Sequence, residues 1–156
     1  MSSPHLRQHL VDLLRGGGAH VTFEDAVADL APEARGRRPA GLPYSAWEQL
    51  EHMRLAQLDI LEFSRSAQHQ SPPWPEGYWP EGPAPPGGAW EKSVEAFHRD
   101  NRAMQELVLD PQRDLLAPFP WGDGQTLLRE ALLVADHNAY HLGQLLVIRR
   151  LLGVWG

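Results

Sequence analysis

The sequence predicts an all-α protein, a four-helix bundle with long connections rich in proline and glycine. Three observations predict this fold. Apolar residues recur at helical spacing in four long stretches. No run alternates Val, Ile and Thr as a strand does. Prolines and glycines gather between the helical stretches. Because 156 residues are the size of one ordinary domain, we expect residues 1–156 to form a single domain.

The first half of the chain begins with a helix expected over residues 4–15. Four leucines have helical spacing there, and the three glycines at 16–18 end the helix. A short helical segment follows, with Thr22 as its N-cap. Residues 31–43 are rich in Pro, Gly and Arg and predict a loop. The second long helix starts at Ser45, which has capping-box spacing to Glu48, and runs to about Gln68.

The second half of the chain begins with a dense set of prolines and glycines at residues 71–88, which excludes a helix or a central strand. A long ordered loop held by its aromatic residues is our interpretation, and a ligand segment for another domain is the alternative. A third helix is expected over residues 89–109. The last helix runs from about 125 to 152 and stops at Gly153, a natural C-terminal cap.

The last helix is apolar almost all the way round. A helix that is apolar on every side is usually buried on every side. In a domain of this size, part of that surface is expected to meet a second copy of the chain. The sequence therefore predicts a homodimer through the C-terminal helix region.

Composition excludes several classes of function. The net charge is −6 and there is no Lys/Arg cluster, which argues against binding to nucleic acid or to an anionic membrane. Without cysteine, the chain has no disulfide, thiolate metal site or cysteine nucleophile. The first residues lack the basic-then-apolar order of a signal peptide, and no stretch approaches about 18 consecutive apolar residues. We therefore expect a cytoplasmic protein.

A histidine pair in the last helix carries the strongest functional signal. His137 and His141 are four residues apart, so both rings project from one helical face. Burying them costs free energy unless their ring nitrogens find partners, and a divalent metal ion provides one. The residue after His137 is Asn138, where a zinc metalloprotease motif needs Glu, so that class is excluded.

The best third ligand is His52 on the second long helix, because facing helices of a bundle commonly share a metal site. Three histidines that are merely core residues are the alternative. His5 and His9 have the same spacing but lie on a short terminal helix, where we interpret them as surface residues. The remaining candidates, His20, His69 and His98, are expected to be solvated.

Further residues around the site are predicted from helical spacing. Glu48 and Asp59 flank His52 by one and two turns and could orient an imidazole through its other nitrogen. Gln144 lies on nearly the same face as the histidine pair. A solvated helix face with Arg partners is the alternative for both acids. Tyr140 is interpreted as a packing residue, and Gly143 as a position that allows close helix approach.

Three segments of the chain resemble the DinB/YfiT-like superfamily. They are the 47–61 helix WEQLEHMRLAQLDIL, the DHNAYHLGQ segment at 136–144 and the closing RRLLG at 149–153, with GAH at 18–20 as in one branch. The resemblance implies a bundle of DinB/YfiT type, often dimeric, whose metal ligands are His52, His137 and His141. It also implies two activities of relatives: thiol S-transfer with bacillithiol or mycothiol, and thiol-dependent maleylpyruvate isomerisation.

Three imidazoles without a fourth protein ligand predict an open site that acts on a small-molecule substrate. The ion, which could be Zn, Ni, Fe or Mn, could lower the pKa of a bound water to about 7 or favour the thiolate form of a thiol. Because the chain has no cysteine, the thiol would be a low-molecular-weight cosubstrate. We expect a metal-dependent thiol S-transferase. The alternatives are a metal-dependent hydrolase and a non-catalytic, stress-related metal-binding dimer.

Overall fold

The computed structural model describes residues 3–156, and its regular structure is helical. The elements are α1 (Pro4–Arg15), α2 (Phe23–Val27), α3 (Pro32–Arg35), α4 (Ala46–Arg65), η1 (Glu76–Tyr78), α5 (Ala89–Leu109) and α6 (Leu127–Leu151). Within this range the only β pairing is one isolated bridge between Pro118 and Thr126. The all-α prediction is confirmed. Two expected loops contain a helical turn: α3 begins at Pro32, a favoured residue at a helix start, and η1 follows Pro75.

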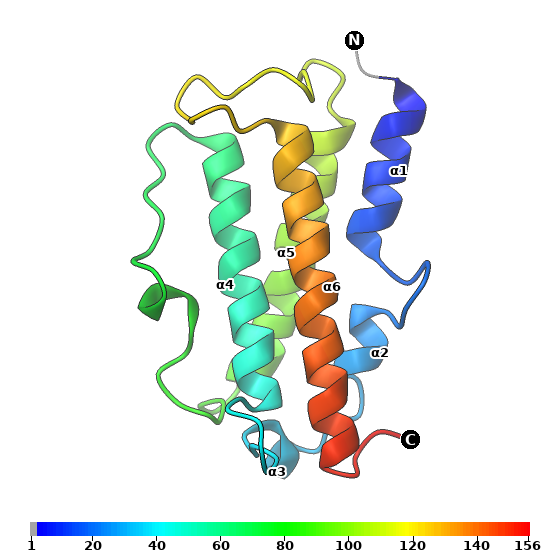
Figure 1. The fold of residues 1–156 in the computed structure, drawn as a ribbon, viewed down its shortest axis with the longest axis vertical. Coiled ribbons are helices and arrows are strands. Elements are labelled where there is room, and N and C mark those ends of the chain that lie inside the picture. Colours follow the sequence, from blue (N-terminus) through cyan, green and yellow to red (C-terminus); the bar gives the residue numbers. More distant parts are fainter. Residues whose placement is uncertain (1–2) are drawn as a thin grey trace.

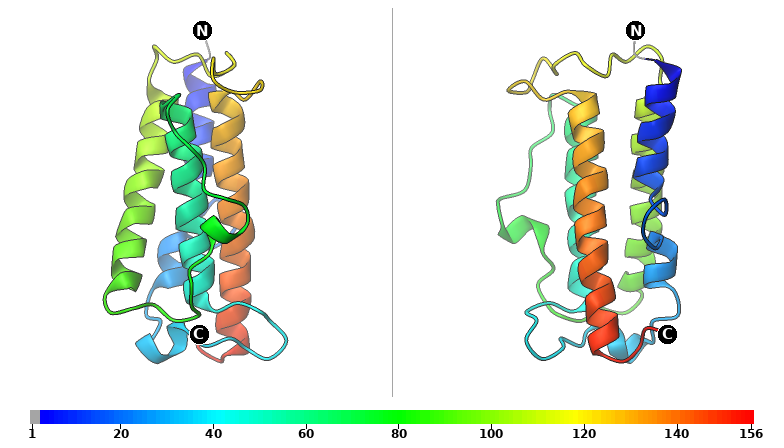
Figure 2. Two further views of the ribbon diagram at one scale, coloured as in Figure 1. Left: turned by 90° about the vertical axis from the view of Figure 1, so that its left-hand side faces the viewer. Right: turned by 45° about the vertical axis from the view of Figure 1, so that its right-hand side comes forward.

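The long helices form a four-cornered bundle (Figures 1 and 2). Helix α4 packs against α5 and α6, and α1 packs against the same two helices. Helices α1 and α4 therefore occupy opposite corners. The corner of α1 is completed by α2, which lies beyond the end of α1 along the same side of the bundle (Figure 1). The first corner is thus built from two short helices, with an interruption at residues 16–22.

Helices α4 and α5 run in the same direction, so the chain must return along the bundle between them (Figure 1). Residues 66–88, here called the crossover, make this return along the outside of α4. Their prolines lack N–H donors and keep the segment from forming a long helix. Helix α4 ends at Arg65, three residues before the predicted end, because Ser66 is already in extended conformation. The crossover thereby carries Tyr78 and Trp79 past α4.

The start of α4 is fixed by the predicted capping box. The Ser45 hydroxyl accepts from the Glu48 N–H at 3.2 Å, and the Glu48 carboxylate accepts from the Ser45 N–H at 2.7 Å. Two otherwise unpaired backbone donors are thus satisfied at the helix start. This cap fixes the start of α4, the helix that carries His52.

The core consists of two apolar clusters with a polar layer between them. One cluster joins α2 to the first turns of α4 and α5 and the end of α6, and the other joins α1 to their opposite ends. Between the clusters, the Gln57 Oε1 accepts from the side-chain amides of Asn101 at 3.0 Å and Asn138 at 2.9 Å. The Gln57 amide donates to the Phe97 carbonyl at 2.8 Å. These hydrogen bonds satisfy amide groups that would otherwise be costly to bury.

Helix α6 is not buried on every side as its composition suggested. A stripe along it is exposed: Leu132 by 43%, Tyr140 by 64%, Val147 by 39% and Leu151 by 59%. The prediction that Tyr140 is a packing residue is therefore wrong for the single chain. The prediction that Gly143 allows close helix approach is also wrong, since a Cβ there would meet only open space.

In the described residues, no helix is long and apolar enough to cross a membrane.

Candidate metal centre

The three predicted ligands converge in the middle of the bundle, where α4 faces α6. The Nε2 atom of His52 lies 3.1 Å from Nε2 of His141 and 3.1 Å from Nε2 of His137. One nitrogen from each ring lies within 4.8 Å of the others. His52 is buried and the other two are half-buried. Because residues i and i+4 share a helix face, α6 supplies two ligands and α4 the third.

The outer nitrogens of two of these rings fix where their protons sit. The Nδ1 of His52 lies 2.8 Å from the Tyr78 backbone carbonyl, and the Nδ1 of His141 lies 2.8 Å from Gln49 Oε1. Since a carbonyl oxygen only accepts, the Nδ1 of His52 carries its hydrogen, and with the Gln49 amide oriented as it is, so does the Nδ1 of His141. The facing Nε2 atoms of His52 and His141 then carry lone pairs and cannot hydrogen-bond to each other. A cation between them removes this conflict.

A proton is a poor candidate for that cation at neutral pH. Burial, then the charge of His52, lowers the pKa of His137 to about 4. Burial, followed by the charges of His137 and His52, lowers the pKa of His141 to about 3. Burial also lowers the pKa of His52. All three rings are therefore neutral at pH 7, the form that binds metal. The donor set fits one divalent ion.

The crossover covers the site with aromatic rings. The Trp79 indole stacks on the His52 imidazole, with ring centroids 4.0 Å apart and planes within 4° of parallel. Tyr44, from the loop before α4, stacks in turn on the Trp79 indole, with ring centroids 4.3 Å apart. These stacked rings exclude water from one face of His52 and hold its ring plane.

The two predicted acidic partners do not contact His52. Glu48 accepts from the Arg38 guanidinium and from the Ser45 N–H, so its carboxylate serves the helix cap. Asp59 accepts from the Tyr78 hydroxyl at 2.7 Å and lies 2.6 Å from His69 Nε2. Asp59 therefore reaches His52 only through Tyr78, whose carbonyl holds the His52 ring.

The predicted role of Gln144 is also not found. Gln144 is half-buried, and in the part of the chain described it has no side-chain hydrogen bond to a histidine. The amide that contacts His141 is that of Gln49. Helical spacing could have flagged Gln49, because it precedes His52 by three residues on the same helix. No sequence signal pointed to the Tyr78 carbonyl or to the Trp79 ring.

The remaining histidines lie outside this cluster. His5, His9 and His20 are exposed, as expected. The prediction of solvation is wrong for His69, which is bound to Asp59 and is 19% exposed. It is also wrong for His98, whose ring lies edge-on to Phe23 with centroids 5.2 Å apart. His69 belongs to the crossover and contacts Asp59 of α4, whereas α2 contacts His98. Both contacts depend on tertiary structure.

The Tyr78 hydroxyl gives a direct test of the crossover's role in the site. Replacing Tyr78 with Phe removes the hydroxyl that Asp59 holds and loosens the carbonyl that orients His52. We expect the Kd for zinc to rise about tenfold, as for other outer partners of metal-bound histidines. Competition with a chromophoric chelator measures this change. Tyr140→Phe, at an exposed hydroxyl, is the matched control, and equal affinity in both variants would contradict the orienting role.

The fold and the site together define a helical bundle with three converging histidines on two facing helices. A family model described as the DinB superfamily matches residues 19–145, which include the crossover and all three histidines. The chain belongs to the DinB superfamily, as the sequence motifs indicated. No curated protein and no solved structure matches the chain. Family membership and the three-histidine group both fit metal binding.

Proposed function

We propose that this protein is a metal-dependent thiol S-transferase that uses a low-molecular-weight thiol. The observation that supports the proposal is the convergence of three neutral imidazoles without a fourth His, Cys, Asp or Glu in the cluster among residues 3–156. Structural zinc sites normally have four protein ligands, whereas sites with three leave a position open for substrate. The ion would be Zn, Ni, Fe or Mn.

The divalent ion would supply one chemical advantage, since a coordinated thiol is deprotonated at neutral pH. In the transfer, the thiol sulfur forms a bond to an electrophilic carbon of the substrate. The leaving group departs with its bonding electrons, and the thiol proton goes to solvent. The chain's residues hold the ligands, exclude water with Trp79 and keep the imidazoles neutral. Because the chain contains no cysteine, the thiol must come from solution.

A turnover assay tests this proposal. Zinc-loaded protein is mixed with bacillithiol or mycothiol and 1-chloro-2,4-dinitrobenzene, and the thioether product is followed by its absorbance. We expect turnover that stops on adding a chelator and returns with zinc. His98→Ala, outside the cluster, should keep this activity. Fully metal-loaded protein that turns over neither thiol with a broad panel of electrophiles would contradict the proposal.

Metal removal separates this function from its structural alternative. In a non-catalytic bundle the ion would join α4 to α6 and carry much of the stability. For a catalytic site we expect chelation to abolish turnover while the melting temperature falls by only a few degrees, since α4 and α6 already share an extensive apolar contact. A loss of tens of degrees without any measurable turnover would favour the structural role. Hydroxide-dependent ester hydrolysis in the same samples tests the hydrolase alternative.

We also propose that the protein is a homodimer through the exposed stripe of α6 and that it works in the cytoplasm, where low-molecular-weight thiols stay reduced. The stripe presents Leu132, Tyr140, Val147 and Leu151 to solvent, with Gly143 between them. Sedimentation at micromolar concentration is expected to give a dimer, and Val147→Glu a monomer, because burying that charge in the contact is costly. A monomeric parent protein would refute the dimer.

A further inference from the structure

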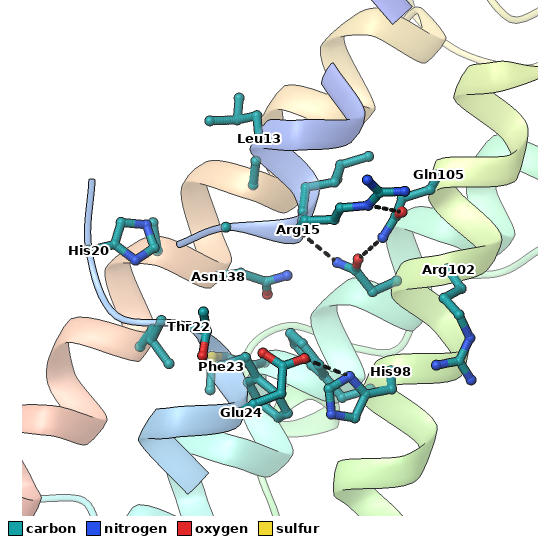
Figure 3. A pocket seen from close by; sticks show the side chains of 18 residues that line it. Leu13, Arg15, His20, Thr22, Phe23, Glu24, His98, Arg102, Gln105 and Asn138 are labelled. Atoms are coloured by element: carbon teal, nitrogen blue, oxygen red, sulfur yellow. Dashed lines mark hydrogen bonds and ion pairs between the residues drawn. The ribbon is translucent and has the colours of Figure 1, made fainter. Parts of the chain in front are cut away.

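A cavity lies on the side of the bundle where the first corner is interrupted (Figure 3). Its volume is about 420 Å³, within the usual range for small-molecule sites. It is lined by residues of α1, α2, α4, α5 and α6 and by none of the three clustered histidines. It is therefore distinct from the candidate metal centre.

The interruption explains why the cavity exists. Helix α1 ends at Arg15, and Gly16 and Gly17 have φ values of +72° and +79°, so the chain turns away before α2 begins at Phe23. Glycine is the residue that adopts this conformation without steric cost. The missing helical turns leave the polar layer of the bundle open on this side.

The polar layer presents an unpaired acceptor at the cavity. Asn138 lines the cavity, and its Oδ1 is buried without a hydrogen-bond partner in residues 3–156. The amide cannot simply be reversed. Gln57 is oriented by the Phe97 carbonyl, so its Oε1 must accept from the Asn138 Nδ2 at 2.9 Å. The Asn101 amide, which donates to the Leu14 carbonyl at 3.1 Å, is fixed in the same way.

This acceptor predicts part of the ligand's chemistry. An unpaired buried oxygen costs free energy, which a ligand N–H or O–H donor would recover. Figure 3 shows Asn138 at the centre of the lining residues, with its oxygen directed toward Thr22 and Phe23. Because this oxygen is shielded from a water-sized probe, a donor at the inner end of a bound molecule reaches it once the neighbouring side chains shift aside.

The charged residues of the cavity favour an anion. Its lining contains two arginines and one glutamate in a chain whose net charge is −6. Arg15 is held by the Gln105 side chain at 3.1 Å, and Glu24 lies 3.4 Å from the His98 ring (Figure 3). Arg102 has no ion pair or side-chain hydrogen bond in the part of the chain described. Its guanidinium is free to bind a carboxylate.

The walls between these polar groups are apolar, with Phe23, Met53, Phe97 and Leu142 among the lining residues. We propose that the cavity binds a small organic carboxylate with a flat apolar body and one N–H or O–H donor. The donor pairs with Asn138 Oδ1, the body packs on the apolar walls, and the carboxylate pairs with Arg102.

Three matched probes test this assignment by isothermal titration. Indole-3-acetate carries the flat body, the N–H and the carboxylate. Naphthalene-1-acetate keeps a flat bicyclic body and the carboxylate but has no N–H, and tryptamine replaces the carboxylate with an ammonium group. We expect indole-3-acetate to bind about tenfold more tightly than either, because each of the others leaves one polar group of the cavity unpaired. Absence of indole-3-acetate binding up to millimolar concentration, or equal binding of naphthalene-1-acetate, would overturn the proposal.

Variants place the bound probe in the cavity. Ala139→Phe fills the cavity from α6 and should abolish binding, and Arg102→Gln, at an exposed residue, should weaken it about tenfold by removing a charge-assisted hydrogen bond. Lys92→Gln, on the same helix but away from the cavity, should bind as the parent does. If Ala139→Phe fails to fold, as circular dichroism would show, the Arg102 and Lys92 variants decide the outcome.

The metal centre provides the last control. His52→Ala should keep its affinity for indole-3-acetate, because His52 does not line the cavity. Failure of the thiol-transfer proposal would leave this result unchanged. Loss of probe binding in His52→Ala would instead place the carboxylate at the metal centre and overturn the assignment.

Discussion

His52→Ala is expected to abolish retention of divalent metal. His52 is the ring that contacts both others, with its Nε2 atom 3.1 Å from each of their Nε2 atoms. Without it, only the His137 and His141 pair on α6 remains. Two neutral imidazoles leave most of the coordination sphere to water, so the affinity for zinc should fall by orders of magnitude. Elemental analysis after dialysis without added metal should give about one ion per chain in the parent and none in the variant.

His98→Ala is the control, because His98 is a partly buried histidine that lies outside the cluster. It should retain as much metal as the parent. Equal metal content in His52→Ala and the parent would place the ion elsewhere. A parent protein that takes up neither zinc nor nickel would leave a helical bundle whose facing imidazole lone pairs need another explanation.

The second large effect is a loss of stability of the metal-free protein in mild acid. The pKa of His137 falls from 6.5 to about 4 on folding, and that of His141 to about 3, with burial as the first cause for both. The folded state therefore binds fewer protons than the unfolded state between these values and pH 6.5. Stability is fully present above pH 6.5 and is lost as the pH falls toward the folded-state values.

The size of this effect follows from the shift. Each pKa unit corresponds to about 1.4 kcal/mol, so the His137 shift alone amounts to about 3 kcal/mol when the transition is complete. Urea unfolding of chelator-treated protein at pH 7.5 and pH 5 measures the part lost between them. His137→Gln has no ring to titrate and should show a flatter profile. A parent profile as flat as that of the variant would show that the rings are protonated freely in the folded state.

Local pattern was sufficient to predict the helices and the histidines that converge between α4 and α6. The Ser45 and Glu48 capping box, the helix limits near Arg15 and Leu109 and the shared face of His137 and His141 all depend on residues within a few positions of one another. Predicting that His52 approaches that pair required one further premise, namely that helices of a bundle face each other. These features appear in the structure where the sequence placed them.

The partners of the ligands could not be predicted in this way. Glu48 and Asp59 have suitable spacing to His52, but Arg38 and Tyr78 bind their carboxylates. Which group reaches a carboxylate depends on the path of a loop, and helical spacing carries no information about that path. For the same reason, the sequence did not predict that Trp79 stacks on His52. Nor did it predict the cavity beside Asn138, which exists only because α1 and α2 leave a gap.

The parallel course of α4 and α5 has a thermodynamic consequence. It obliges the crossover to pass over His52, where the Tyr78 carbonyl and the Trp79 ring hold one ligand in place. Binding of an ion and ordering of residues 66–88 are then thermodynamically linked. The ordered crossover favours ion binding, and a bound ion favours the ordered crossover by the same free energy. A protease that cleaves within this segment should therefore act as a reporter of occupancy, cutting the loaded protein more slowly than the empty one.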